Sequence, residues 1–123
     1  SYFQSIDNDN NRACLQRFFA QDRASIQPNM CWEAAYFQVH LFAHALRASG
    51  NDEIECLRPY LLGAEFNAPQ GRVKIDARTQ HTVLYPRIGR AQANGQFSIL
   101  AQATIGVLPD PYLVTHALDA VYD

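Results

Sequence analysis

Residues 31–51 read CWEAAYFQVHLFAHALRASGN, and this stretch decides the fold. Its apolar residues recur every three or four positions, which predicts a helix from about Cys31 to Ser49. Gly50 follows, and glycine readily adopts the left-handed conformation that ends such a helix. The main apolar stripe is formed by Trp32, Ala35, Tyr36, Val39, Phe42, Ala43 and Leu46. Three further apolar residues lie off that stripe: Phe37, Leu41 and Ala45. Apolar side chains thus cover more than half of the circumference, as is typical of a helix packed between other elements.

Two shorter helices are predicted on either side of this one. Asp7 or Asn8 can cap the first, because their side chains accept hydrogen bonds from the free N–H groups of a helix start. Its predicted inner face comprises Asn11, Cys14, Leu15, Phe18 and Phe19. The other begins with Asp52 and Glu55 in capping-box-like spacing, and Pro59 predicts a kink or a split within it.

Strands are expected after Gly71, where the apolar spacing changes to a period of two. Val73 and Ile75 alternate with polar residues, which indicates a half-buried strand, and residues 77–80 (ARTQ) predict a turn.

A hairpin is predicted within residues 81–103, turning at Asn94 and Gly95. Pro86 must then lie where no ladder hydrogen bond is needed, at an edge or a bulge. The tail, residues 107–123, has two prolines in three positions and should be extended.

The order of these elements predicts an incomplete α/β fold. Helices come first and antiparallel strands follow, yet an almost wholly apolar helix normally covers a parallel sheet, and only a fragment of strand at residues 2–3 precedes it. We therefore expect Ser1 to be a cut rather than a natural start. No repeat, linker or shift of composition marks a second domain within residues 1–123.

Composition excludes several classes of function. With 10 basic and 12 acidic residues, the net charge of −2 offers no broad field for nucleic acid. No apolar run reaches the roughly 20 residues that a membrane-spanning helix needs. Cys14, Cys31 and Cys56 are odd in number and lie in apolar patterns, so we expect buried, reduced thiols and a reducing compartment.

The histidines offer a weak metal motif. His40 and His44 have the i, i+4 spacing that can hold zinc on a helix, but no Glu follows the first His as in H-E-x-x-H. We expect a structural or surface role for both, and structural hydrogen bonds for His81 and His116.

Enzyme chemistry has little support in the sequence. No G-x-S-x-G elbow is present, and PQGRVK at residues 69–74 lacks the G-K-[ST] of a phosphate loop. Cys31 stands near a helix start that could lower a thiol pKa, but a buried inert thiol is the favoured interpretation. We expect no enzyme activity and no cofactor.

Trp32 and Glu33 are the candidate ligand-binding residues. They stand at the start of the long helix, and ligands of doubly wound α/β proteins approach the ends where helix N-termini point. An aromatic ring beside an acid could form a pocket wall and accept an amide N–H. The alternative is that Trp32 begins the core stripe and Glu33 complements the helix dipole.

Several pieces together resemble the type I periplasmic-binding fold, in particular its C-terminal third. These pieces are YFQSID at residues 2–7, WEAAY at 32–36, APQG-VKID at 68–76, RIG-AQANGQF at 87–97 and PDPY at 109–112. More narrowly, they resemble the branch that contains the aliphatic amidase negative regulator and the urea or short-chain-amide binding proteins of ABC transporters. The ending, residues 114–123, is more similar to the regulator.

This resemblance implies a two-lobed ligand-binding protein of which residues 1–123 are a C-terminal fragment, with a crossing between lobes near residues 83–90. It implies a cytoplasmic amide or urea sensor that controls amidase expression through a partner regulator, an antiterminator. One alternative is the solute-binding subunit of a urea or amide ABC transporter, whose partner is a permease; it would be periplasmic if a signal peptide precedes Ser1 in the gene. A second is a structural or assembly module without a ligand. The fragment itself is expected to self-associate through uncovered apolar surface on the long helix.

Overall fold

The computed structural model describes residues 1–21 and 26–111. Its elements are α1 (Asp9–Phe19), α2 (Met30–Ser49), α3 (Ile54–Leu61), β1 (Glu65–Ala68), β2 (Gly71–Ile75), β3 (Thr82–Val83), β4 (Arg87–Ala91) and β5 (Phe97–Gln102). β1, β2 and β3 form one antiparallel sheet in that order, and β4 pairs with β5 in a separate antiparallel hairpin. The predicted order of helices followed by antiparallel strands is confirmed.

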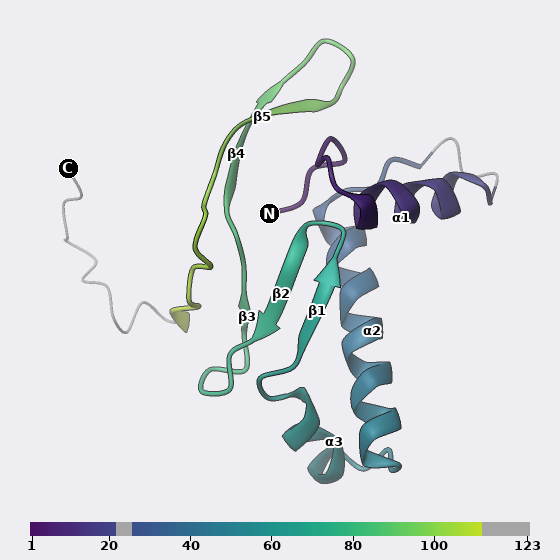
Figure 1. Cartoon of the computed structure of the whole chain (residues 1–123), viewed down its shortest axis with the longest axis vertical. Helices are drawn as coiled ribbons and strands as arrows, with labels where there is room; N and C mark the ends of the chain where they lie inside the picture. The colour runs from purple at the N-terminus through teal and green to yellow at the C-terminus, as the bar shows by residue number, and fades with distance from the viewer. Residues whose placement is uncertain (22–25, 112–123) are drawn as a thin grey trace.

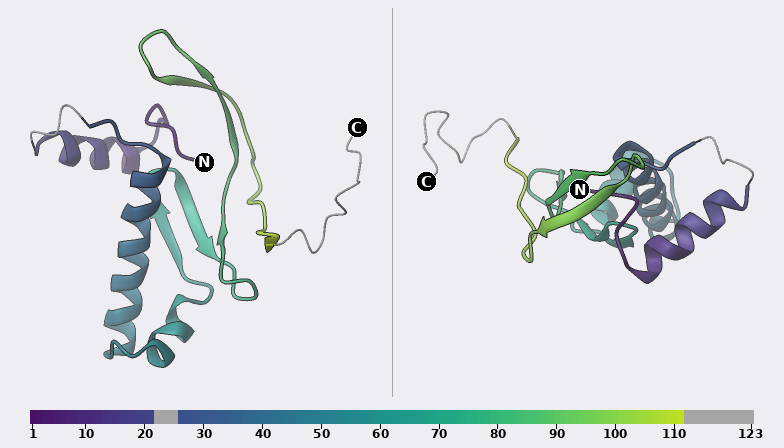
Figure 2. Two further views of the ribbon diagram at one scale, coloured as in Figure 1. Left: turned by 180° about the vertical axis from the view of Figure 1, so that it is seen from behind. Right: turned by 90° about the horizontal axis from the view of Figure 1, so that it is seen from above.

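The long helix α2 lies along β1 and β2 (Figure 1). α1 lies near its N-terminal end and α3 near its C-terminal end, while β4 and β5 form a long arm on the other side of β2; Figure 2 shows the same arrangement from two further directions. The core lies between α2 and the β1–β2 hairpin, where Phe37 and Leu41 pack against Ala68 and Val73.

Both ends of α2 are set by local sequence; the end at Gly50 was predicted, and the cap at its start was not. Asn29 is the N-cap, and its Oδ1 accepts hydrogen bonds from the backbone N–H groups of Cys31 and Trp32, both at 3.0 Å. Gly50 ends the helix with φ of 65°, a backbone conformation that costs a residue with a side chain more than it costs glycine.

The buried face of α2 differs from the predicted main stripe. Its buried residues are Glu33, Phe37, Leu41 and Ala45, three of which the apolar pattern had set off the stripe. The stripe itself is only partly covered: Val39 is 66% exposed and Phe42 is 48% exposed, whereas Trp32, Tyr36, Ala43 and Leu46 are half-buried. The physical reason is that β1, β2 and α3 pack on one side of the helix, so the described residues leave the opposite apolar side open.

The two shorter helices confirm one prediction and contradict two. Asn8 caps α1 by accepting from the N–H of Asn11 at 2.8 Å. The predicted capping box of α3 is absent, because Glu53 is the N-cap and makes no side-chain capping bond. Of the kink or split expected at Pro59, the split is wrong: α3 is one continuous helix of eight residues, in which the proline removes a single intrahelical hydrogen bond.

The first sheet contains a strand that the apolar pattern missed. β1 pairs with β2, with Phe66 opposite Val73. The predicted strand from Gly71 is confirmed, and Asp76 fixes the following turn by accepting from the N–H and hydroxyl of Thr79 at 2.8 and 2.7 Å.

The hairpin prediction is confirmed for residues 87–102 but not for the segment before them. Thr82 and Val83 pair with β2 instead. Pro86 lies between the two sheets, where its missing N–H breaks no ladder, as predicted. Val107 forms a single bridge with Leu84, and the predicted tail beyond residue 111 lies outside the described residues.

The cysteine prediction holds for one thiol of three. All three cysteines are free, and Cys14 is buried, but Cys31 and Cys56 are exposed. Both exposed thiols lie near the start of a helix, on turns that the core does not cover.

Candidate functional site

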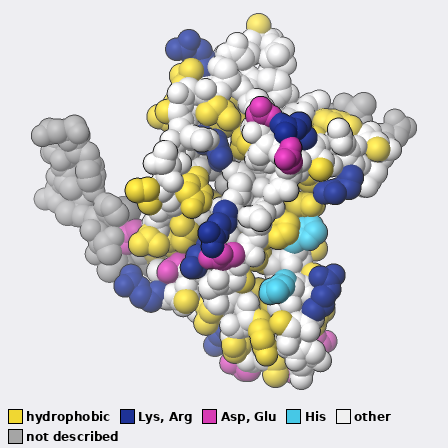
Figure 3. Space-filling view, viewed as in Figure 1, with side chains coloured by type: hydrophobic (Ala, Val, Ile, Leu, Met, Phe, Trp, Pro, Cys, Tyr) yellow, Lys and Arg dark blue, Asp and Glu magenta, His cyan; other side chains and the backbone are white. Residues whose placement is uncertain are grey.

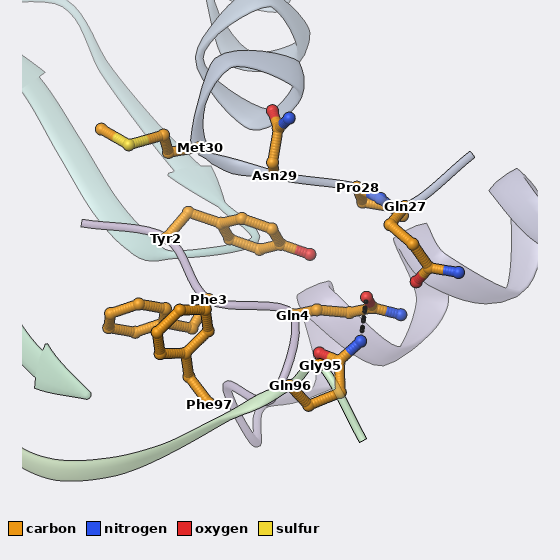
Figure 4. Close-up of a pocket in the computed structure, with 10 residues that line it drawn as sticks. All are labelled: Tyr2, Phe3, Gln4, Gln27, Pro28, Asn29, Met30, Gly95, Gln96 and Phe97. Carbon is orange, nitrogen blue, oxygen red and sulfur yellow. Dashed lines mark hydrogen bonds between the residues drawn. The ribbon is translucent and has the colours of Figure 1, made fainter. Parts of the chain in front are cut away.

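A groove of about 310 Å³ lies beside the N-terminal end of α2. Three separate segments of the chain line it: residues 2–4, residues 27–30 and residues 95–97 at the tip of the β4–β5 hairpin (Figure 4). The lining residues are Tyr2, Phe3, Gln4, Gln27, Pro28, Asn29, Met30, Gly95, Gln96 and Phe97. Its volume is in the usual range of small-molecule sites.

Two contacts hold the hairpin tip against the N-terminal segment. The rings of Phe3 and Phe97 stack with centroids 5.0 Å apart, and Gln96 Nε2 donates to Gln4 Oε1 at 3.0 Å (Figure 4). Ser5 adds a hydroxyl bond to the carbonyl oxygen of Phe97. These contacts join residues more than ninety positions apart into one wall.

Tyr2 forms the inner side of the groove and is itself fixed. Its hydroxyl donates to Asn11 Oδ1 at 2.9 Å, and the Asn11 amide donates to the carbonyl oxygens of Gln4 and Ile6 at 3.0 and 2.7 Å. Burial raises the pKa of Tyr2, so its phenol stays neutral at physiological pH. The aromatic wall is therefore rigid and uncharged.

The chemistry of the groove is that of amides and aromatic rings. Four lining side chains are amides, which both donate and accept hydrogen bonds, and none of the ten lining residues carries a formal charge at neutral pH. Asn29 and Met30 place the positive end of the α2 dipole at the rim. Such a groove suits a small, neutral, polar molecule with an apolar part.

Trp32, one of the two predicted site residues, does not line this groove and belongs to an aromatic cluster. Its ring lies 6.1 Å from that of Tyr2, 5.1 Å from Phe18 and 6.0 Å from Tyr36, measured between centroids. It lines a second, shallower depression of about 230 Å³ between α1 and α2, together with Arg17. That Trp32 binds a ligand stays a prediction.

Glu33, the other predicted residue, is only 1% exposed and turns toward the β1–β2 turn. Its Oε1 accepts from the backbone N–H of Gln70 at 3.2 Å, and its Oε2 accepts from Gln70 Nε2 at 2.7 Å. It does accept amide N–H groups, as the sequence suggested, but the amide here belongs to the chain. The structure thus separates the two predicted residues instead of bringing them together.

The histidines have structural contacts. His40 stacks on Phe66 with ring centroids 4.8 Å apart, and His81 Nδ1 lies 2.6 Å from the carbonyl oxygen of Thr79, whereas His116 is outside the described residues. Within residues 1–21 and 26–111, no group of three potential ligands could hold a metal ion. In the same part of the chain, no helix is long and apolar enough to cross a membrane.

Sequence reasoning missed the groove because its walls come together only in the fold. One weak signal exists: the groove segments YFQ at residues 2–4 and GQF at 95–97 each place a glutamine beside a phenylalanine. Nothing in the chain order shows that these segments meet.

A family model described as Periplasmic binding protein domain matches residues 1–118. The chain belongs to this family. This confirms the resemblance at the level of the family and of the type I fold. The narrower branch of the amidase regulator has no such support.

Solved structures of solute-binding proteins show the same fold as this periplasmic binding protein domain. One from an R. palustris ABC transporter in complex with benzoate has a TM-score of 0.76 and 22% identity, covering 89% of this chain and 30% of that chain. Another, from Rhodopseudomonas palustris BisB5 with 3,4-dihydroxybenzoic acid, has a TM-score of 0.73 and 19% identity over the same two shares. A substrate-binding protein from Sphaerobacter thermophilus has a TM-score of 0.67 and 20% identity, covering 83% and 29%.

A curated relative carries an enzyme name. It is called limonene hydroxylase, from Geobacillus stearothermophilus, and is 26% identical over 125 residues. The match covers 98% of this chain but 22% of that protein. This periplasmic binding protein domain thus spans about a fifth of the length of the curated relative and about a third of the length of the solved structures.

Proposed function

We propose that the chain forms part of a solute-binding protein whose ligand is a small neutral amide, such as a short-chain amide or urea. The observation that carries this proposal is the uncharged, amide-lined groove at the start of α2. An amide ligand offers one carbonyl acceptor and N–H donors, which Gln and Asn side chains match without an unpaired group. The Phe3–Phe97 pair offers apolar contact for its hydrocarbon part.

Charge argues against an anionic ligand at this groove. The two R. palustris solute-binding proteins are in complex with aromatic acids, and a carboxylate removed from water needs a cation or several donors. The ten residues that line the groove here supply no cation, and only the helix dipole would favour an anion. A neutral ligand therefore fits this chain better.

Transport is the first proposed use of the bound ligand. The solved neighbours are solute-binding proteins of ABC transporters, and a shared fold makes an ABC permease the natural partner. In this role the protein would bind and release its ligand unchanged, outside the cytoplasmic membrane. The proposed crossing between lobes near residues 83–90 agrees with the position of Pro86, where the chain passes from one sheet to the other.

Amide sensing in the cytoplasm, with an antiterminator as partner, is the second candidate function. The observation that favours it is the pair of exposed free thiols, Cys31 and Cys56, because exposed thiols persist best in a reducing compartment. A signal peptide upstream in the gene would support transport, and its absence there would support sensing.

The test is calorimetric titration of the full-length gene product that contains this chain with acetamide, urea and benzoate. We expect saturable binding of acetamide or urea and weaker binding of benzoate. Gln96→Leu removes an amide from the groove and should raise the Kd about three- to tenfold, because the loss of one hydrogen bond to the ligand weakens binding by about that factor. Gln38→Leu, on the exposed side of α2, is the control and should leave the Kd unchanged.

Tight binding of benzoate with no binding of amides would contradict the proposed ligand class. The alternative of a structural module without a ligand would gain support if none of the three compounds bound.

A further inference from the structure

Arg87 stands where the chain enters the β4–β5 arm, and its guanidinium joins three segments of backbone. Nη1 donates to the carbonyl oxygen of Ser1 at 2.8 Å and lies 3.4 Å from that of Tyr85. Nη2 donates to the carbonyl oxygen of Gln70 at 2.7 Å. Nε donates to Gln102 Oε1 at 3.2 Å on the neighbouring strand. One side chain thus ties the N-terminal segment, the β1–β2 turn and the β4–β5 hairpin together.

Gln70 is held from the other side by α2. Its backbone N–H and side-chain amide both donate to the Glu33 carboxylate, at 3.2 and 2.7 Å, while its carbonyl oxygen accepts from Arg87. The β1–β2 turn is therefore held by hydrogen bonds to a buried acid, Glu33, on one side and to a half-buried base, Arg87, on the other. Residues Glu33, Gln70 and Arg87 are called the clasp below.

The charges of the clasp depend on each other. Burial lowers the pKa of Arg87 and raises the pKa of Glu33, and in each case the opposite charge of the other residue acts against the shift. Loss of either group would leave the other less compensated in a poorly hydrated place. The clasp therefore acts as a unit.

The clasp lies directly beside the groove wall. Ser1, whose carbonyl binds Arg87, precedes the groove residues Tyr2, Phe3 and Gln4. Further along β4, Gly89 packs against the Phe3 ring so closely that a Cβ there would lie 2.9 Å from Phe3 Cζ. Displacing β4 at Arg87 would thus displace the aromatic wall of the groove.

We propose that Arg87 is a positioning residue for the groove: it holds residues 1–4 against the β1–β2 turn, and the ligand affinity depends on this hold. The inference rests on the proposed function, because it names the group that orders the wall of that binding site. The hydrogen bonds of the Arg87 side chain all go to residues that do not line the groove. Arg87 acts instead through the backbone of Ser1 and through Gly89 on its own strand.

Hydrogen–deuterium exchange and acetamide titration of the full-length gene product test this inference together. The variants are Arg87→Ala and Arg87→Lys, and the matched control is Arg90→Ala, which removes an exposed arginine from the same strand. Arg87→Ala should speed exchange in residues 1–6 and 69–71 several-fold while residues 34–45 of α2 keep their protection. The Kd for acetamide should rise about tenfold, since charge-assisted bonds are lost. Arg87→Lys keeps the positive charge and can still donate a hydrogen bond, so its exchange rates and Kd should lie between those of Arg87→Ala and those of the wild type.

The inference is overturned if exchange in residues 1–6 is unchanged in Arg87→Ala, or if it rises equally in residues 34–45, since the second result indicates a general loss of stability. It is also overturned if the Kd of Arg87→Ala matches that of Arg90→Ala. If the wild-type protein binds no acetamide, the proposed ligand fails, and local exchange alone then decides whether Arg87 holds the wall.

Discussion

For Glu33, the sequence predicted the chemistry of the side chain correctly but not its partner. The sequence marked it as an acid at a helix start that could accept an amide N–H. The structure buries it and supplies that amide from Gln70, thirty-seven residues away in the chain. A carboxylate in such a place costs stability unless its hydrogen bonds are kept.

The burial of Glu33 predicts a pH dependence of stability. Burial raises its pKa in the folded protein, while hydrogen bonds from Gln70 act in the opposite direction without cancelling the shift. The folded state therefore binds this proton at a higher pH than the unfolded state does. Lowering the pH through the raised folded pKa should increase the contribution of Glu33 to the free energy of unfolding, and the gain should be complete below the unfolded value of about 4.3.

Urea denaturation of the wild type and of Glu33→Gln from about pH 8 down to about pH 4 measures this effect. Because the variant cannot titrate at this position, the difference in unfolding free energy should move in favour of the wild type as the pH falls. A difference that is constant, or that moves the other way, would show that the folded carboxyl has an ordinary or lowered pKa.

At the scale of the element, α2 has two apolar sides, and the described residues bury one of them far more completely than the other. Phe37 and Leu41 are each 3% exposed against the β1–β2 hairpin, whereas Val39 is 66% exposed on the other side. Apolar spacing alone cannot tell which side a chain will cover with its own residues. That choice depends on where β1 and α3 fold back, which is a long-range property.

Matched truncations on the two sides of α2 test this description. Leu41→Ala should lower the free energy of unfolding by about 2–5 kcal/mol, because it leaves a cavity in the core. Val39→Ala should change it by no more than about 0.5 kcal/mol, since the side chain is mostly in water. Chemical denaturation of both variants gives the two values, and equal losses would mean that both sides of the helix are buried.

The features that sequence predicted well are those set by near neighbours. Asn8 at the start of α1 and Gly50 at the end of α2 act within one helical turn, and the turn at Gly95 lies within its own hairpin. The groove could not be predicted in this way, because Gln4 and Gln96 are ninety-two residues apart and are brought together only by the tertiary fold. The same holds for Arg87 and the carbonyl oxygen of Ser1.

At the scale of the whole molecule, exposed apolar residues are prominent on two surfaces of the part that the structure describes. One is the Val39 side of α2, and the other is the arm formed by β4, β5 and the residues after them, where Figure 3 shows hydrophobic side chains at the surface. On the arm, Ile88 is 65% exposed and Ile105 is 79% exposed. Open apolar surface of this extent is typical of interfaces with other protein parts.

We predict that the polypeptide of residues 1–123 self-associates on its own. Analytical ultracentrifugation should show a sedimentation coefficient that rises with concentration, because the open side of α2 is removed from water on association. Phe42→Glu, which places a charge on that side, should shift the protein toward monomer, while His44→Glu on the polar side should not. A monomer at every concentration would indicate that the Val39 side does not mediate self-association in solution.

We propose that the groove at the start of α2 is one wall of the ligand site of a solute-binding protein. The most direct measurement is a crystal structure of the full-length gene product grown with acetamide or urea. We predict that the ligand lies against the Phe3–Phe97 pair, within hydrogen-bond distance of the Gln4 or Gln96 amide. A ligand that is bound elsewhere and touches none of residues 2–4, 27–30 or 95–97 would contradict the claim.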